Sequence, residues 1–149
     1  MDKWGPNIWC YIHTYTTKIK ENLNNNEMKI VMEHLYSVST NLPCPMCSEH
    51  ARKYLSSKYK YVHSKSELVK LFIDFHNDVN KRKSKPIKEN NIIDIYKSKQ
   101  LIECANNYVY TWQKASTSKY LGSNSNFANK LYIKRFKEYY WKYVHLLEK

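Results

Sequence analysis

Apolar residues recur at every third or fourth position through most of this chain, which is the spacing of one face of an α-helix. We therefore expect helices at residues 6–20, 27–40 and 45–56. Proline opens the first and third of these stretches, and proline is favoured in the first turn of a helix. The second stretch should end at Asn41-Leu42-Pro43, because the residue before a proline disfavours helical geometry.

The pattern continues through the second half of the chain. A fourth helix should follow Ser64, since Ser64-Lys65-Ser66-Glu67 has capping-box spacing, and it should end before Pro86. Residues 91–114 are again helical in pattern but less regular, and residues 116–126 predict a loop. The last helix is expected from Phe127 to the end, with Asn126 as its N-cap.

Composition supports an all-α fold. The chain has 149 residues, enough for one domain with a real core, but only 2 glycines and 4 prolines. The turns of β-sandwiches and the glycine loops of nucleotide-binding α/β folds are therefore missing. Four helices within the first 85 residues, joined by short polar loops, predict an antiparallel four-helix bundle with one or two additional C-terminal helices.

Charge adds less. Lys and Arg total 25 against 13 acidic residues, a net charge of +12, which raises affinity for nucleic acid, anionic membranes or acidic partners without identifying any of them. No apolar run approaches the ~20 residues that span a bilayer, and the first residues lack the apolar stretch of a secretory signal. We expect an intracellular protein without a signal peptide.

The chemistry begins at Cys44-Pro45-Met46-Cys47, a Cys-x-x-Cys unit with His50 three residues further on. Two thiols at this spacing can close a disulfide across one helical turn, and so small a disulfide is usually kept for its chemistry. Cys47 falls in the first turn of the expected helix, where free backbone N–H groups and the helix dipole favour a thiolate. The pair therefore indicates either redox chemistry or metal binding.

Two further clusters place polar groups on expected helix faces. Trp9 and His13 are four residues apart, as are His76 and Asn80, so each pair projects from one face. Trp9 beside His13 is also what a packed aromatic next to a satisfied histidine looks like. The polar stripe of His76, Asn77 and Asn80 is harder to explain as part of a hydrophobic core, because a buried amide needs hydrogen-bond partners.

Together these clusters resemble the Erv/ALR sulfhydryl oxidases, FAD-dependent enzymes that make disulfides. The resemblance runs from Trp4 to about Tyr96 and is most like the compact members of large DNA viruses. It rests on three motifs in order: Trp4-Gly5-Pro6-x-x-Trp9-x-x-x-His13, Leu42-Pro43-Cys44-x-x-Cys47-x-x-His50 and His76-Asn77-x-Val79-Asn80. Any one motif alone is weak, whereas three in order are specific.

The resemblance implies a helical bundle that holds FAD beside the redox disulfide, with a short fifth helix at the adenine end. Cys47 would be the flavin-proximal thiol, and Cys44 would receive electrons from a substrate dithiol; oxygen would reoxidise the flavin and give hydrogen peroxide. The resemblance assigns the FAD contacts to Trp9, His13, Cys47, His76, Asn77, Val79, Asn80, Lys83, Lys85 and Tyr96. It implies no metal, a protein dithiol substrate, a thioredoxin-like carrier as one source of electrons, and a homodimer in the host cytoplasm or virion.

The chain departs from the family in two places. Lys83-Ser84-Lys85-Pro86 keeps the Lys and Pro of the usual Leu-Gly-Lys-Pro but loses its glycine. The structural cysteine pair found after the flavin motif in many members is reduced here to Cys104. Nothing in the sequence fixes how far Cys104 lies from Cys10, so we expect a small buried residue and a helix-face thiol rather than a disulfide, with a shuttle role left open.

We place the oxidase-like domain at residues 1–100 and a C-terminal helical extension, packed on the bundle or mediating interaction, at 101–149. A zinc site fits poorly, because no second Cys/His pair follows Cys47 and His50. A thioredoxin-like enzyme would need strands around its Cys-x-x-Cys unit. The remaining alternative is a basic helical protein that binds nucleic acid, since Lys alternates with Tyr and Trp near the C-terminus.

Overall fold

The computed structural model describes residues 4–88, 91–115 and 123–148, and within these it contains helices and no strand. The α-helices are α1 (Gly5–Lys18), α2 (Asn25–Thr40), α3 (Pro45–Ser56), α4 (Lys65–Arg82), α5 (Ile92–Lys97), α6 (Leu101–Ala115) and α7 (Ser123–Lys142). Short 3₁₀ turns lie at Tyr59–Tyr61 and Val144–Leu146. The predicted all-α class is confirmed. None of the described helices has the length and apolar character needed to cross a membrane.

Helix starts follow from side chains that satisfy free backbone N–H groups. Asn24 accepts from the Glu27 N–H while the Glu27 carboxylate accepts from the Asn24 N–H, a complete capping box before α2. The hydroxyl of Ser64 accepts from the Glu67 N–H and begins α4. The first three helices begin and end within two residues of their predicted bounds, and α4 begins directly after Ser64 and ends at Arg82, before Pro86 as predicted.

The C-terminal half differs from its prediction. Residues 91–114, which were expected to be helical but irregular, form the two helices α5 and α6. The polar run from Lys97 to Gln100 separates them, and the Lys18 ammonium donates to the Lys97 carbonyl (2.7 Å) at the end of α5. The N-cap prediction at Asn126 is wrong, since α7 already begins at Ser123. Residues 116–122 of the expected loop lie outside the described residues.

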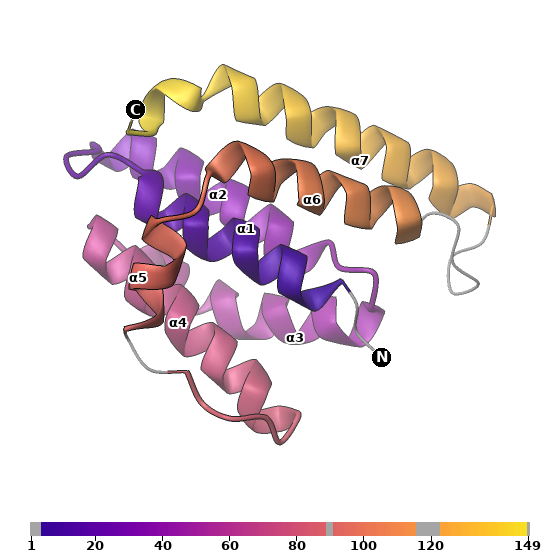
Figure 1. Cartoon of the computed structure of the whole chain (residues 1–149), viewed down its shortest axis with the longest axis horizontal. Coiled ribbons are helices and arrows are strands. Elements are labelled where there is room, and N and C mark those ends of the chain that lie inside the picture. Colours follow the sequence, from indigo (N-terminus) through magenta and orange to yellow (C-terminus); the bar gives the residue numbers. More distant parts are fainter. Residues whose placement is uncertain (1–3, 89–90, 116–122, 149) are drawn as a thin grey trace.

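Helix α1 is central to the arrangement. It packs against α6 on one side and against α4 and α5 on the other, while α2 pairs with α3. In Figure 1, α7 runs along the top of the molecule and α6 lies next to it, in front of α2, while α3, α4 and α5 lie below α1. A backbone bridge between Ile19 and Leu147 joins the end of α1 to the last residues of the chain. One face of α1 thus serves the core with the C-terminal helices, and the other faces α4 and α5.

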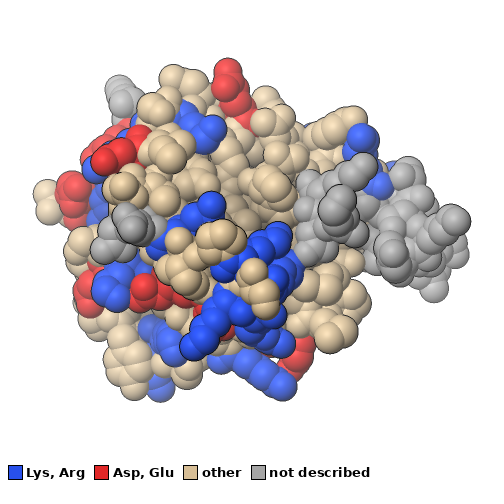
Figure 2. Space-filling model, turned by 60° about the horizontal axis from the view of Figure 1, so that its bottom comes forward, with Lys and Arg blue, Asp and Glu red and all other residues tan. Residues whose placement is uncertain are grey.

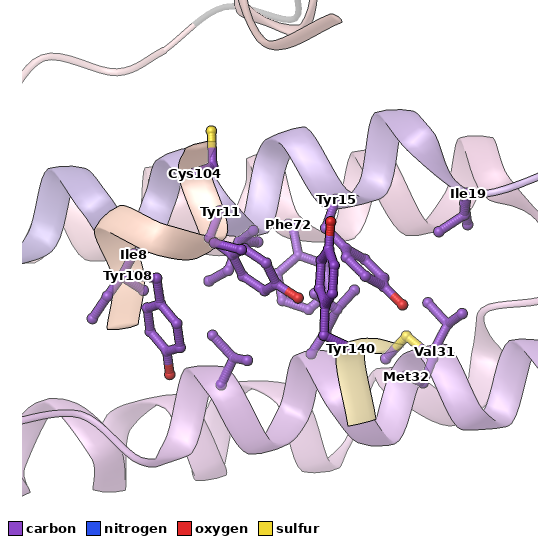
Figure 3. Close-up of a cluster of buried hydrophobic side chains, with 14 of the residues drawn as sticks. Ile8, Tyr11, Tyr15, Ile19, Val31, Met32, Phe72, Cys104, Tyr108 and Tyr140 are labelled. Carbon is purple, nitrogen blue, oxygen red and sulfur yellow. The ribbon is translucent and has the colours of Figure 1, made fainter. Parts of the chain in front are cut away.

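Aromatic side chains connect the C-terminal helices to the first two. Tyr108 of α6 stacks on Tyr11 of α1 with ring centroids 5.4 Å apart, and both are fully buried. Tyr140 of α7 lies in the same cluster, as Figure 3 shows. In α2, the His34 ring stacks on Tyr139 at 4.0 Å and its Nε2 pairs with the Tyr11 hydroxyl at 2.7 Å. Residues from both halves of the chain therefore share one core.

Candidate redox and cofactor site

A cavity of about 550 Å³ opens among α1, α3, α4 and α5. Its size is in the range of cofactor and ligand pockets. It is lined by every site residue that the sequence predicted except His13 and Asn77; these lining residues are Trp9, Cys44, Cys47, His76, Val79, Asn80, Lys83, Lys85 and Tyr96. The structure thus brings together residues that lie up to 87 positions apart, from Trp9 to Tyr96. Trp4 and His50 also line this cavity.

Cys44 and Cys47 form a disulfide in the cavity wall, with their Cα atoms 5.2 Å apart. Cys44 is the N-cap of α3, and its Sγ accepts from the Cys47 N–H at 3.2 Å. Both side chains are partly exposed, and Met46 between them is 80% exposed. The disulfide can therefore be reached from solvent as well as from the cavity. A thiolate formed at Cys47 would lie at a helix N-terminus, which stabilises negative charge.

His50 is held beside this disulfide by a carboxylate that the sequence analysis did not identify. Its Nε2 lies 2.6 Å from the Asp78 Oδ2, and the pair joins α3 to α4. Asp78 occupies the unspecified position of the His76-Asn77-x-Val79-Asn80 motif, so the motif gave no signal for it.

Aromatic rings stack along the wall formed by α1 and α4. Trp9 lies flat on His76 with centroids 3.9 Å apart, and the His76 Nδ1 is 2.9 Å from the His13 Nε2. Burial lowers the pKa of His13 to about 3, and burial followed by nearby Lys88 and Lys85 lowers the pKa of His76 to about 4. Both imidazoles are therefore neutral at pH 7, and one ring nitrogen donates to the other.

His13 and Asn77 support the cavity without lining it. His13 lies behind His76 and beside Tyr96, whose ring centroid is 4.9 Å from that of His13. The Asn77 side chain makes two hydrogen bonds with the backbone of Lys88: its amide donates to the carbonyl at 2.8 Å, and its oxygen accepts from the N–H at 2.7 Å. This pair of bonds holds the segment after α4 against the helix.

The end of α4 turns through Ser84, which has φ of 55°. The Lys85 N–H bonds to the Asn80 carbonyl and the Ser84 N–H to the Lys81 carbonyl, which together make a Schellman motif. Ser84 stands where the resembled family has glycine, and the turn forms nonetheless. It keeps Lys83 and Lys85 on the cavity wall.

Four cationic side chains line this part of the cavity: Arg82, Lys83, Lys85 and Lys88. Figure 2 shows Lys and Arg gathered on the face that includes this end of the molecule. The Lys83 ammonium also lies 5.8 Å from the centre of the Trp4 ring. The cavity thus combines stacked aromatic rings and a disulfide with positive charge of the kind that a diphosphate requires.

Buried polar atoms without partners test whether a ligand belongs in this space. The Asn80 Nδ2, the Ser39 Oγ and the His13 Nδ1 are buried and make no hydrogen bond, and Asn80 and Ser39 line the cavity. Such groups are costly unless something satisfies them. A flat heteroaromatic ring system could stack on the aromatic side chains, and its polar edges could bond the unpaired buried atoms. A diphosphate joined to it could pair with the cationic side chains. The residues present therefore fit FAD.

The same geometry gives the zinc alternative no support. His50 already pairs with Asp78, and Cys44 and Cys47 are joined to each other. Within residues 4–88, 91–115 and 123–148, no three His, Cys, Asp or Glu side chains are grouped so that they could hold a metal ion.

Comparison with known proteins bears on the same part of the chain. The Erv1/Alr family matches residues 6–101. The African swine fever virus (isolate Pig/Kenya/KEN-50/1950) protein named "FAD-linked sulfhydryl oxidase" is 31% identical over 56% of this chain and 71% of its own length. "Putative FAD-linked sulfhydryl oxidase 347L" of Invertebrate iridescent virus 6 is 33% identical over 56% of this chain and 82% of its own length. "Mitochondrial FAD-linked sulfhydryl oxidase erv1" of Schizosaccharomyces pombe is 29% identical over 47% of its own length. No solved structure matches. The match over residues 6–101 covers more than half of the chain, so this protein belongs to the Erv1/Alr family.

Proposed function

We propose that this protein is an FAD-linked thiol oxidase that forms disulfide bonds in protein substrates. The observation that carries the proposal is the placement of the Cys44–Cys47 disulfide in the wall of the cavity that is also lined by the Trp9–His76 stack and by cationic side chains. A redox-active disulfide and a site suited to FAD are thus one site. The curated relatives named FAD-linked sulfhydryl oxidases support the same activity.

The protein's own step is thiol–disulfide exchange. A substrate thiolate attacks the Cys44 Sγ, the Cys44–Cys47 bond breaks, and Cys47 leaves as a thiolate. The second substrate thiolate then attacks the substrate sulfur bound to Cys44, which releases Cys44 and completes the substrate disulfide. Two electrons have passed from the substrate to the Cys44 and Cys47 dithiol. Cys47 is the better leaving group because the N-terminus of α3 stabilises its charge.

When bound, FAD would supply the two-electron oxidation of the dithiol and the reduction of oxygen to hydrogen peroxide. The residues of this chain would bind and orient it. Trp9 and His76 offer a flat apolar surface, Asn80 a hydrogen-bond donor, and Lys83 and Lys85 positive charge. Val79 and Tyr96 complete the walls. His13 and Asn77 do not line the cavity; His13 holds the His76 ring in place, and Asn77 holds the segment that contains Lys88.

His50 is suited to exchange protons with the thiols as the disulfide opens and closes. It lines the same cavity as both cysteines, and the Asp78 carboxylate fixes its ring through Nε2. This leaves Nδ1 as the nitrogen available for exchange. Asp78 is therefore a positioning residue for His50.

The visible spectrum of the purified protein tests cofactor binding directly. Protein expressed in a flavin-replete cell should be yellow and show oxidised-flavin absorbance that stays with the folded chain through gel filtration. A folded, colourless preparation that does not take up added FAD would sink the proposal.

Serine variants test the two cysteine roles. Cys44→Ser and Cys47→Ser should each abolish oxygen consumption with dithiothreitol, and Cys47→Ser should change the flavin spectrum more, because Cys47 is assigned to the flavin side. Cys104→Ser, which replaces a buried thiol that does not line the cavity, is the matched control and should retain activity. Activity surviving in either variant of the disulfide would contradict the assignment.

The substrate and setting belong to the same proposal. The exposed Met46 and the partly exposed disulfide suit contact with a protein dithiol, with a thioredoxin-like carrier as one source of electrons. Viral relatives support a viral protein acting in the host cytoplasm or virion. A homodimer, expected from the family resemblance, is tested by sedimentation at several protein concentrations.

A further inference from the structure

A second pair of sulfur atoms lies between α1 and α6. The Sγ atoms of Cys10 in α1 and Cys104 in α6 are 2.8 Å apart, although the residues are 94 positions apart in sequence. A disulfide bond is about 2.04 Å long, so closure needs a movement of less than about 1 Å. In Figure 3 the Cys104 sulfur points away from the neighbouring aromatic rings. The sequence alone could not place these residues together.

We propose that Cys10 and Cys104 form a second disulfide, which fastens α6 to α1 and is separate from the redox disulfide. Cys104 is 3% exposed and Cys10 is partly exposed, so the two thiols differ in access. Neither residue is among those that line the cavity. The pair is therefore assigned a role in holding the C-terminal helices, rather than in passing electrons to Cys44.

The Cys10–Cys104 pair lies in a packed contact between α1 and α6. The Cys104 Sγ is also 3.6 Å from the Thr14 hydroxyl, one turn along α1 from Cys10. Tyr96 of α5 and Lys99, which follows α5, are close enough to act electrostatically on these thiols or be acted on by them. Tyr96 also contacts His13 and lines the cavity. A covalent link here would hold α1, and the residues around the α5–α6 junction, at the edge of the cofactor site.

The oxidation balances with a disulfide as oxidant, taken from solution or from the Cys44–Cys47 site of another molecule. The Cys10 thiolate attacks one sulfur of that disulfide and expels the other as a thiolate. Cys104 then attacks the Cys10 Sγ and expels the second. Two thiols lose two electrons and two protons, and the oxidant becomes two thiols. Cys10 reacts first because it is the accessible member.

The thiol content of a variant lacking the redox disulfide tests the pairing. Full-length protein carrying Cys44→Ser and Cys47→Ser retains only Cys10 and Cys104. After incubation with oxidised glutathione and denaturation, neither should react with an alkylating agent, and peptide mapping should find Cys10 joined to Cys104. After reduction, both should be alkylated. Alkylatable thiols after oxidation, a stable glutathione adduct on Cys10, or disulfide-linked dimers would each overturn the proposal.

Thermal unfolding provides a second readout. In the same variant, oxidation should raise the melting temperature by about 5–15 °C, because the link closes a long loop in the unfolded chain. Adding Cys104→Ser should remove this rise. Equal melting temperatures for the oxidised and reduced forms of the parent variant would overturn the proposal that the disulfide fastens α6 to α1. The variant cannot oxidise thiols through Cys44 and Cys47, so these results are independent of the proposed oxidase activity.

Discussion

At the scale of single residues, the buried histidines make stability depend on acid. Burial lowers the pKa of His13 and His34 to about 3 and, with nearby lysines, that of His76 to about 4, from an ordinary value of 6.5. Above pH 6.5 these rings are neutral in both states, so they add no pH dependence. Below it the unfolded chain binds protons that the folded chain cannot, and the free energy of unfolding falls as the pH falls.

Each buried histidine should therefore lower the free energy of unfolding by up to about 1.4 kcal/mol per pH unit between about pH 6 and its folded pKa. Urea denaturation at pH 7, 6 and 5 measures this slope. His34→Leu removes a histidine that does not line the cavity of the redox disulfide, and it should flatten the slope even if stability is lower at every pH. The exposed His63 is the control, and His63→Gln should leave the slope unchanged. Equal slopes in all three proteins would contradict the assignment of the acid sensitivity to buried rings.

The His50–Asp78 pair carries a second residue-scale prediction. Asp78→Ala removes the carboxylate that fixes the His50 ring, so thiol oxidation should slow by about tenfold or more. Asp78→Glu, which restores a carboxylate, should recover part of the rate. The matched control is Asp74→Ala, one turn earlier on α4, where the carboxylate pairs only with the exposed Lys70 among the described ion pairs.

The measurement is oxygen consumption with dithiothreitol as a function of pH, with the flavin spectrum recorded for each variant. A merely structural role would lower activity without changing the shape of the pH profile. The positioning role requires that shape to change in Asp78→Ala and to return toward the original in Asp78→Glu. A profile identical to that of the parent protein would exclude it.

At the scale of elements, Ser84 ends α4 in a conformation that favours glycine. Its φ of 55° lies in the left-handed region, where a Cβ atom costs about 1–2 kcal/mol, and its N–H and that of Lys85 complete the Schellman bonds. Ser84→Gly should therefore raise the free energy of unfolding by about 0.5–1 kcal/mol, the remainder being lost to the greater freedom of glycine in the unfolded chain.

A serine at another helix end gives the matched control for this change. Ser57 is the C-cap of α3 with φ of −87°, where glycine relieves no steric cost, so Ser57→Gly should be neutral or destabilising. Chemical denaturation of both variants measures the difference. Destabilisation by Ser84→Gly would mean that the turn depends on the serine side chain rather than on its backbone.

The elements also show what sequence could predict. The start of α4 followed from a cap formed by two residues three positions apart, Ser64 and Glu67, so the local pattern located it. The hydrogen bond from the Lys18 ammonium to the Lys97 carbonyl at the end of α5 joins residues 79 positions apart, and no local pattern indicated it. The same limit applies in the site: Cys44 and Cys47 are visible as a motif, whereas the pairing of His50 with Asp78 requires α3 and α4 to be packed. Contacts between distant helices were the part that a single sequence did not reveal.

At the scale of the whole molecule, the C-terminal helices complete the core that positions the site. Tyr108 in α6 is fully buried, stacks on Tyr11 and pairs through its hydroxyl with Tyr132 of α7 at 2.8 Å. Tyr11 lies on α1, the helix that also carries Trp9 to the cavity wall. The residues beyond the matched 6–101 stretch therefore bear on the placement of the cofactor site, although they do not line it.

Tyr108→Ala should lower the free energy of unfolding by about 3–5 kcal/mol, because it removes a large buried ring and leaves the Tyr132 hydroxyl without its partner. Tyr110→Ala, two residues along the same helix where the ring is 53% exposed, should change it by no more than about 0.5 kcal/mol. Denaturation followed both by helical circular dichroism and by flavin release distinguishes one core from two. A single core requires both signals to shift together in Tyr108→Ala. If helix loss occurred first while flavin release stayed at its original denaturant concentration, the C-terminal helices would be a separate unit that does not support the site.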